Sequence, residues 1–210
     1  MKYKFYSYRY GLEILQSEDE FKKEWEDLID ILNNISEQDI ILHFQKYGKN
    51  NMSISTTLNK ILKIRFKDKE WKPESAIFSE KERKKEKEYN DKRWRLDFAK
   101  ENVSVEVAFN HGEAVAWNLT KPLLASELNH VEKEIQTKIG IVITATDEMK
   151  KAGGFDNSIG SYEKYIRYLK PMSNILTVPM LIIGLDKPDT FRIDVRKNKD
   201  NKNRGHIVKI

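Results

Sequence analysis

Cysteine is absent from this chain of 210 residues. Its absence excludes a disulfide framework, a thiolate metal site and a cysteine nucleophile. It also fits a reducing compartment, and we expect a cytoplasmic protein. No stretch approaches the roughly 18 consecutive apolar residues of a membrane span, and the N-terminus lacks the apolar segment of a signal peptide. We therefore expect no membrane association.

The composition has 39% hydrophobic and 34% charged residues, which is typical of a soluble globular protein. We expect one domain over residues 1–210. Lys and Arg exceed Asp and Glu by 38 to 33, a net charge of +5 that permits nucleic-acid binding without requiring it. The basic tail, residues 196–210, begins RKNKDNKNRGHIVK, with six basic residues against one acidic residue. It fits a phosphate-facing role and a solvated surface equally well.

Residues 1–95 are predicted to be mainly helical and to contain elements that contact DNA and the second subunit of a dimer. SEDEFKKEWEDLIDILNNI, residues 17–35, has one apolar helical face, and Ser17 and Glu20 have the spacing of a capping box. A second, shorter helix is expected over residues 53–66, ending before a proline-containing turn. Residues 79–94, SEKERKKEKEYNDKRW, have no apolar face and are either a solvated helix or a mobile connector.

The second half of the chain alternates apolar strands with helices. The expected strands are residues 94–99, 103–109, 139–145, 178–185 and an edge strand at 190–196, and the expected helices are 121–136 and 162–169. On the helix at 121–136, Pro122 lies near the start and Leu128 on the apolar face. This order predicts an α/β fold with a partly parallel central sheet.

Two acidic residues mark the strand pair at residues 94–109. Alternate residues from Val103 to Phe109 are apolar, so Glu106 emerges on the opposite face, where Asp97 of the preceding strand could join it. Two adjacent carboxylates repel each other unless one is protonated or a cation lies between them. Mg²⁺ prefers oxygen ligands and activates bound water for attack on phosphate. The alternative is the wet face of an amphipathic strand, which the spacing alone favours.

The segments RLDF…VEVAFN, SELNH and IVIT, in this order, resemble type II restriction endonucleases of the BglII/BstYI group. In that group an Asp precedes a V-E-V-x-F strand by the same interval, and a similar E-L-x-H helix follows. GLEIL, the residues Lys69–Trp71 and VPMLIIGL extend the likeness over most of the chain. The resemblance implies a restriction-endonuclease-like PD-(D/E)xK core over residues 96–195, with a central mixed β-sheet flanked by helices.

The same resemblance implies a function. It predicts a homodimer around palindromic double-stranded DNA, Mg²⁺-dependent phosphodiester hydrolysis and a cognate DNA methyltransferase as functional partner. Members of the group read palindromes with a GATC core, so a GATC-containing site is the first expectation. Asp97 and Glu106 are then the metal ligands, with a backbone carbonyl of Val107 or Ala108 as a further oxygen.

The family pattern is broken at Ala108, the third catalytic position. Relatives have Lys, Gln or Glu there, and that side chain helps to position the attacking water. Three explanations stay open. The residue was replaced deliberately to trap uncut DNA, or another side chain reaches the site, or the protein binds DNA without efficient cutting. The candidate substitutes are Lys100, His111 and Glu127, of which Glu127 could also extend the acidic cluster.

Residues that read DNA bases are expected in loops. Asn110 and His111 leave the catalytic strand, and Asn157 and Ser158 match an Asn-Ser pair with which the resembled group contacts bases. Without the resemblance, Asn-Ser in a glycine-rich loop is ordinary turn chemistry. As a group, the candidate phosphate contacts are Lys121, Arg192, Arg196, Lys197 and Arg204.

The leading hypothesis is therefore a type II restriction endonuclease, with its activity in this chain impaired if nothing replaces the side chain at Ala108. The alternative is a sequence-specific DNA-binding protein on a nuclease fold, which Ala108 alone favours. Retention of both Asp97 and Glu106 argues against it, because buried acids without a metal reduce stability. A structure-specific repair nuclease is a third hypothesis, which predicts little preference among duplex sequences.

Overall fold

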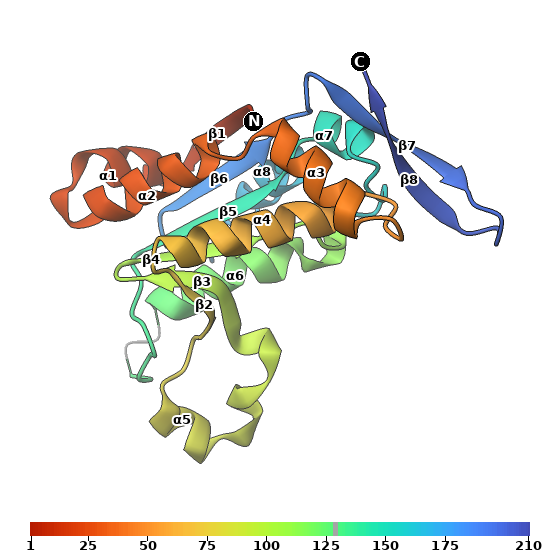
Figure 1. The fold of residues 1–210 in the computed structure, drawn as a ribbon. Helices are drawn as coiled ribbons and strands as arrows, with labels where there is room; N and C mark the ends of the chain where they lie inside the picture. Colours follow the sequence, from red (N-terminus) through yellow and green to blue (C-terminus); the bar gives the residue numbers. More distant parts are fainter. Residues whose placement is uncertain (128–129) are drawn as a thin grey trace.

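A six-stranded mixed sheet forms the centre of the protein (Figure 1). The computed structural model describes residues 1–127 and 130–210. The strand order is β1 (Tyr3–Tyr8), β6 (Met180–Leu185), β5 (Ile139–Ala145), β4 (Val103–Val107), β3 (Arg95–Lys100) and β2 (Lys72–Ala76). β4, β5 and β6 are parallel, and β1, β3 and β2 each pair antiparallel with their neighbours. The predicted α/β architecture with a mixed sheet flanked by helices is confirmed.

Helices cover both faces of this sheet. One face carries α1 (Gly11–Ser17), α2 (Lys22–Asn33), α3 (Glu37–Tyr47) and α4 (Ser55–Asp68), and the other carries α6 (Val115–Ser126) and α8 (Tyr162–Leu169). Side chains alternate between the two layers: Ile141 packs with the α2–α4 side, whereas Val142 packs with α6. Burial on both faces explains why the central strands are continuously apolar in sequence.

The first predicted helix is shorter than expected. A 3₁₀ turn at Asp19–Phe21 precedes α2, and Ser17 is the last residue of α1, so the predicted Ser17–Glu20 capping box is wrong. The helix expected at 53–66 is confirmed as α4, but Pro73 of the turn expected after it lies in strand β2. Neither edge strand of the sheet was expected: β1 lies beside β6 and β2 lies beside β3.

The helix expected at 121–136 is wrong in both its bounds. α6 begins at Val115, after a 3₁₀ turn at Gly112–Ala114, and ends at Ser126, so Pro122 lies inside the helix. Leu128, expected on its apolar face, lies outside the described residues. Val131 and Ile135, further along the expected helix, pack as non-helical chain against a small core under β3. The spacing of apolar residues alone does not distinguish a helix that continues to residue 136 from non-helical chain that packs the same side chains.

Residues 77–94 form an arm that projects from the sheet between β2 and β3 (Figure 1). The arm contains α5 (Glu80–Lys85) and 3₁₀ turns at Lys87–Asn90 and Lys92–Trp94. α5 buries no side chain, so of the two predictions for this segment, a solvated helix or a mobile connector, the solvated helix agrees with residues 80–85. Aromatic stacking closes the arm at its base, where the Phe78 and Tyr89 ring centroids are 4.0 Å apart.

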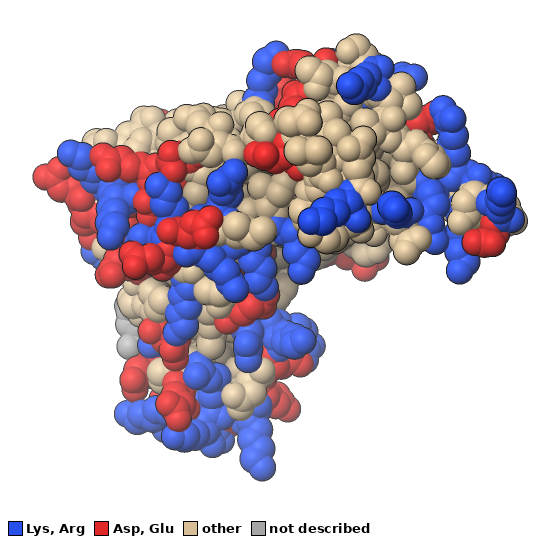
Figure 2. Space-filling view, viewed as in Figure 1, with Lys and Arg blue, Asp and Glu red and all other residues tan. Residues whose placement is uncertain are grey.

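The expected edge strand at 190–196 does not join the central sheet. It forms β7 (Phe191–Lys197), which pairs with β8 (Asn203–Lys209) from the basic segment in a separate two-stranded ribbon. Phe191 and Ile193 anchor the ribbon in the core on the α2–α4 side. Lys and Arg gather on the arm, where acids accompany them, and at the outer end of the ribbon, with a notch in the outline between these projections (Figure 2). Among the described residues, no helix is long and apolar enough to cross a membrane.

Candidate active site

The two acidic residues singled out in the sequence lie on neighbouring strands. β3 and β4 are antiparallel, with Phe98 opposite Val105, and Asp97 and Glu106 are the next residues along each strand. The backbone N–H of Val107 donates a hydrogen bond of 2.7 Å to Asp97 Oδ2, which holds this carboxylate against β4. The expectation that Asp97 and Glu106 lie together agrees with this geometry.

Glu106 does not lie on a wet face, as an amphipathic strand would place it. Only 1% of the residue is exposed, because α6 covers this side of β4. Its Oε2 forms an ion pair with Lys121 Nζ, and its buried Oε1 has no hydrogen-bond partner within the described part of the chain. Burial raises the pKa of Glu106 to about 8; the charge of Asp97 also raises it, and Lys121 opposes both effects.

Lys121 was expected to face DNA phosphates, and the structure corrects this. The residue is 8% exposed, and its Nζ donates to the Arg95 carbonyl at 3.0 Å in addition to pairing with Glu106. Gly140 on β5 makes this placement possible, because a Cβ there would lie 2.5 Å from Pro122 Cβ. The missing side chain lets α6 approach the sheet, and the residue before Pro122 then reaches Glu106.

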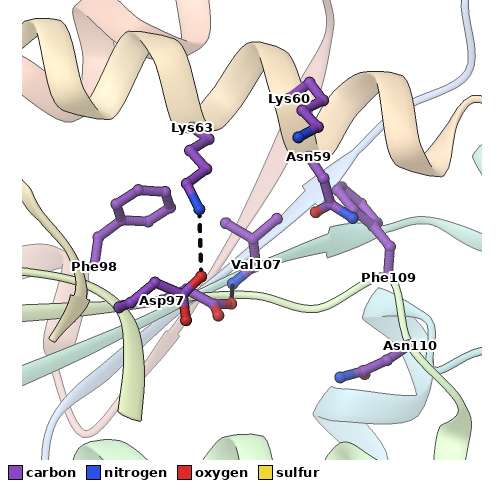
Figure 3. Close-up of a pocket in the computed structure, with 9 residues that line it drawn as sticks. Asn59, Lys60, Lys63, Asp97, Phe98, Val107, Phe109 and Asn110 are labelled. Atoms are coloured by element: carbon purple, nitrogen blue, oxygen red, sulfur yellow. Dashed lines mark hydrogen bonds and ion pairs between the residues drawn. The ribbon is translucent and has the colours of Figure 1, made fainter. Parts of the chain in front are cut away.

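A cleft of about 370 Å³ opens over Asp97 on the opposite, α4 side of the strands (Figure 3). Burial raises the pKa of Asp97, and the charge of Lys121 is the strongest opposing influence. Lys63 of α4 points into the cleft and pairs with Glu74 of β2 at 3.4 Å. The full lining is Asn59, Lys60, Lys63, Glu74, Asp97, Phe98, Val107, Phe109 and Asn110.

Sequence reasoning missed Lys63 and Glu74. Neither belongs to a recognisable motif, and only the packing of α4 over β2 and β3 brings them to Asp97. Glu74 has a φ of 50°, a left-handed conformation that is uncommon for a residue with a side chain. The stretch around Glu74 was predicted as a turn, so no signal in the sequence indicated its place on strand β2.

The donor set fits a hard divalent cation only in part. Asp97 and Glu106 offer carboxylate oxygens, and Oε1 of Glu106, which has no partner in residues 1–127 and 130–210, is a buried acceptor that a cation would satisfy. The carbonyl of Ala108 accepts a hydrogen bond from Thr144 Oγ1 at 2.9 Å, so this oxygen is already engaged. No group of three or more acidic, His or Cys side chains with metal-site geometry occurs among the described residues. Water or phosphate oxygens would therefore have to complete the coordination of Mg²⁺.

The three substitutes expected for the side chain missing at Ala108 lie elsewhere. Lys100 Nζ binds Asp27 at 2.8 Å and the Lys69 carbonyl at 2.7 Å. Glu127 accepts a hydrogen bond from Thr177 and does not line the cleft. His111 contacts Ser158. These contacts correct the expectation that one of the three reaches the carboxylates.

The two segments expected to read bases lie side by side. His111 Nδ1 is 2.7 Å from Ser158 Oγ, and the N–H of Gly112 donates to the Ser158 carbonyl at 2.7 Å. Asn110 belongs to the same surface, since its carbonyl accepts from Gly160 N–H at 3.1 Å, and its side chain also lines the cleft. Asn157 is exposed.

The candidate phosphate contacts other than Lys121 lie on the ribbon, apart from this surface. Arg192, Arg196 and Lys197 are exposed on β7, and Arg204 is half-buried on β8. The guanidinium of Arg196 pairs with Asp194, with a distance of 2.6 Å between Nη2 and Oδ2. These four residues are accessible at the surface, as expected for phosphate contacts, whereas Lys121 is buried.

Comparisons with known proteins identify the family of the chain. The model of the family described as restriction endonuclease BglII/BglIII matches residues 3–185. The fold is similar to that of restriction endonuclease BglII in complex with a DNA 16-mer (TM-score 0.67, 19% identity) and of free BglII (TM-score 0.57, 18% identity). Both comparisons cover 100% of each chain. No curated protein sequence matches. Because the family match spans nearly the whole chain, the protein belongs to the BglII/BglIII restriction endonuclease family and is a type II site-specific deoxyribonuclease.

Proposed function

We propose that this protein hydrolyses phosphodiester bonds at a short palindromic site in double-stranded DNA, with Mg²⁺ bound at Asp97 and Glu106. The observation that carries the proposal is the carboxylate pair itself. Glu106 is buried, with one oxygen that has no hydrogen-bond partner among the described residues, and Asp97, opposite it on β3, lines the cleft. The Lys121 ammonium neutralises one charge of this buried pair and a metal cation would neutralise the other, so the pair is explained best as a cation site.

Each residue of the site has a task in this proposal. Asp97 and Glu106 would hold Mg²⁺, which stabilises negative charge on the phosphate and activates water. The N–H of Val107 orients Asp97 through the hydrogen bond described above. Lys60 and Lys63, at the mouth of the cleft, would attract the DNA backbone.

Recognition of the DNA is assigned to the surface formed by Asn110, His111, Asn157 and Ser158, with Arg196 and its neighbours on the ribbon contacting phosphates. BglII has been crystallised with a DNA 16-mer, and this chain shares its fold. A palindrome requires two copies of the reading surface, so we propose a homodimer. A GATC-containing palindrome is the first site to test, and a methyltransferase of the same specificity would protect the host DNA.

A second candidate function is DNA binding without efficient cleavage. Ala108 favours it, because the methyl group cannot position water and lies buried with α6 side chains. Under this alternative the protein binds a specific site but leaves both strands intact. Cleavage and binding therefore have to be measured on the same preparation.

The test is cleavage of DNA containing many different palindromes, with Mg²⁺, with Mn²⁺ and with a chelator. The proposal expects discrete fragments in the presence of metal, and rates at least about 100-fold lower for Asp97→Asn and Glu106→Gln. Asp189→Asn is the matched control, because it removes an exposed carboxylate paired with Lys2.

Specific binding without fragments under any condition would support the second candidate. If the Ala108→Gln or Ala108→Lys variant then cut the DNA, Ala108 would be the residue that prevents cleavage by this chain. Binding with no preference among sequences would contradict both functions.

A further inference from the structure

Ala108 faces the α6 layer and not the cleft. It is 1% exposed and packs with Val115 and Leu119 of α6. Because residues two apart on a strand share a face, Ala108 and Glu106 point the same way. A cation that serves Glu106 on this face has to come from another element.

Lys121 of α6 meets this requirement. Its ammonium contacts Glu106 Oε2 and donates to the carbonyl of Arg95, two residues before Asp97. An ammonium has three N–H donors, and these two acceptors account for two of them among the described residues. Lys121 does not line the cleft over Asp97, so its ammonium would act on a bound phosphate through its charge and not by direct contact.

We propose that Lys121 supplies, from helix α6, a cation beside Glu106 on the face where Ala108 leaves the strand without a polar side chain. This inference rests on the proposed function. In hydrolysis a water oxygen forms a bond to phosphorus, the bond from phosphorus to a deoxyribose oxygen breaks, and that oxygen gains a proton. An ammonium beside Glu106 stabilises the negative charge that grows on the phosphate during this exchange.

The other lysines near the strands are less suitable. Lys63 approaches Asp97 from the α4 side, pairs with Glu74 at 3.4 Å, and has a side chain that is 41% exposed. Lys100 is as buried as Lys121 but is held by Asp27 on another part of the molecule. Lys100 is therefore a matched control for the removal of a buried, ion-paired lysine.

The first experiment compares Lys121→Ala with Lys100→Ala. We expect Lys121→Ala to remain folded, to bind DNA like the parent, and to cleave at least about 100-fold more slowly in Mg²⁺. Ethylammonium, which fits the space of the deleted side chain, should restore part of the rate in Lys121→Ala and leave Lys100→Ala unchanged. Cleavage by Lys121→Ala at the parent rate would overturn the inference.

The second experiment moves the lysine from the helix to the strand. Ala108→Lys alone overfills a buried position, but the double variant with Lys121→Ala releases the volume of one lysine side chain. We expect the double variant to recover at least about tenfold over Lys121→Ala, because the ammonium returns to the same face. If neither the relocated lysine nor ethylammonium restores cleavage in a folded protein, Lys121 only holds α6 in place and the inference is wrong.

A third measurement separates this inference from the proposed function. Titration calorimetry without DNA measures Ca²⁺ or Mn²⁺ affinity, and removing one ammonium beside the carboxylates should tighten binding about tenfold or more. This is expected for Lys121→Ala and not for Lys100→Ala, whether or not the parent cuts DNA. A parent that never cuts would contradict the proposed cleavage, whereas equal metal affinity in the parent and Lys121→Ala would contradict the role of Lys121.

Discussion

His111 Nδ1 lies 2.7 Å from Ser158 Oγ, although the two residues are 47 positions apart in the chain. The contact joins the segment that leaves β4 to the loop that precedes α8. Asn110, one residue before His111, also lines the cleft over Asp97. The polar groups proposed to read bases and the carboxylates proposed to hold metal are therefore connected through a single short segment of chain.

This contact predicts a loss of specificity when either partner is truncated. His111→Ala or Ser158→Ala should weaken binding to the cognate site by about 1–3 kcal/mol and leave non-specific binding nearly unchanged. Arg196→Ala is the contrasting variant, since loss of a phosphate contact weakens binding to all sequences alike. Fluorescence anisotropy with cognate and scrambled duplexes measures both constants. An equal loss on both duplexes for His111→Ala would contradict a base-reading role.

The raised pKa of Glu106 predicts a pH-dependent stability of the metal-free protein. Its native pKa is about 8, against an ordinary value of 4.5. Between these values the unfolded state has released the proton and the native state retains it, so stability falls as pH rises, by up to about 1.4 kcal/mol per pH unit. Urea unfolding at pH 5, 6.5 and 8 measures this slope. Glu106→Gln should flatten it, and an unchanged slope would show that other groups cause the dependence.

Gly140 is predicted to control how closely α6 approaches the carboxylates. A Cβ at this position would lie 2.5 Å from Pro122 Cβ, so Gly140→Ala has to push α6 away from β5. We expect a loss of about 1–3 kcal/mol in the free energy of unfolding, together with slower cleavage because Lys121 moves from Glu106. Chemical unfolding and a cleavage assay test the two effects. Parent-like values for both would mean that the helix is not held by this contact.

The lysines at the mouth of the cleft should determine part of the salt dependence of DNA binding. Lys60 and Lys63 line the opening over Asp97, and each would neutralise about one phosphate. Replacing both by Ala should lower the slope of log affinity against log salt by about 2. Lys46→Ala, an exposed lysine on α3, is the control. An unchanged slope in the double variant would remove these lysines from the DNA interface.

The strands were predictable because their sequence signal is local. β3, β4, β5 and β6 lie close to their expected bounds, since alternation or a continuous apolar run reports the burial of each face. α6 was misplaced because its start follows a short 3₁₀ turn that has no strong cap, and because Val131 and Ile135 continue an apolar spacing without continuing the helix. β7 reads as a strand, but its partner β8 lies in a polar, basic segment with little strand signal.

The sequence by itself determined the α/β class, the pairing of Asp97 with Glu106 and the anomaly at Ala108, because neighbouring strands and residue spacing carry that information. Only the tertiary structure decided that Glu106 is buried, that Lys121 is its partner, and that Lys63 and Glu74 share the cleft with Asp97. These contacts join elements far apart in the chain. Their geometry depends on how closely helices pack on the sheet, as at Gly140, and no local pattern of residues encodes that distance.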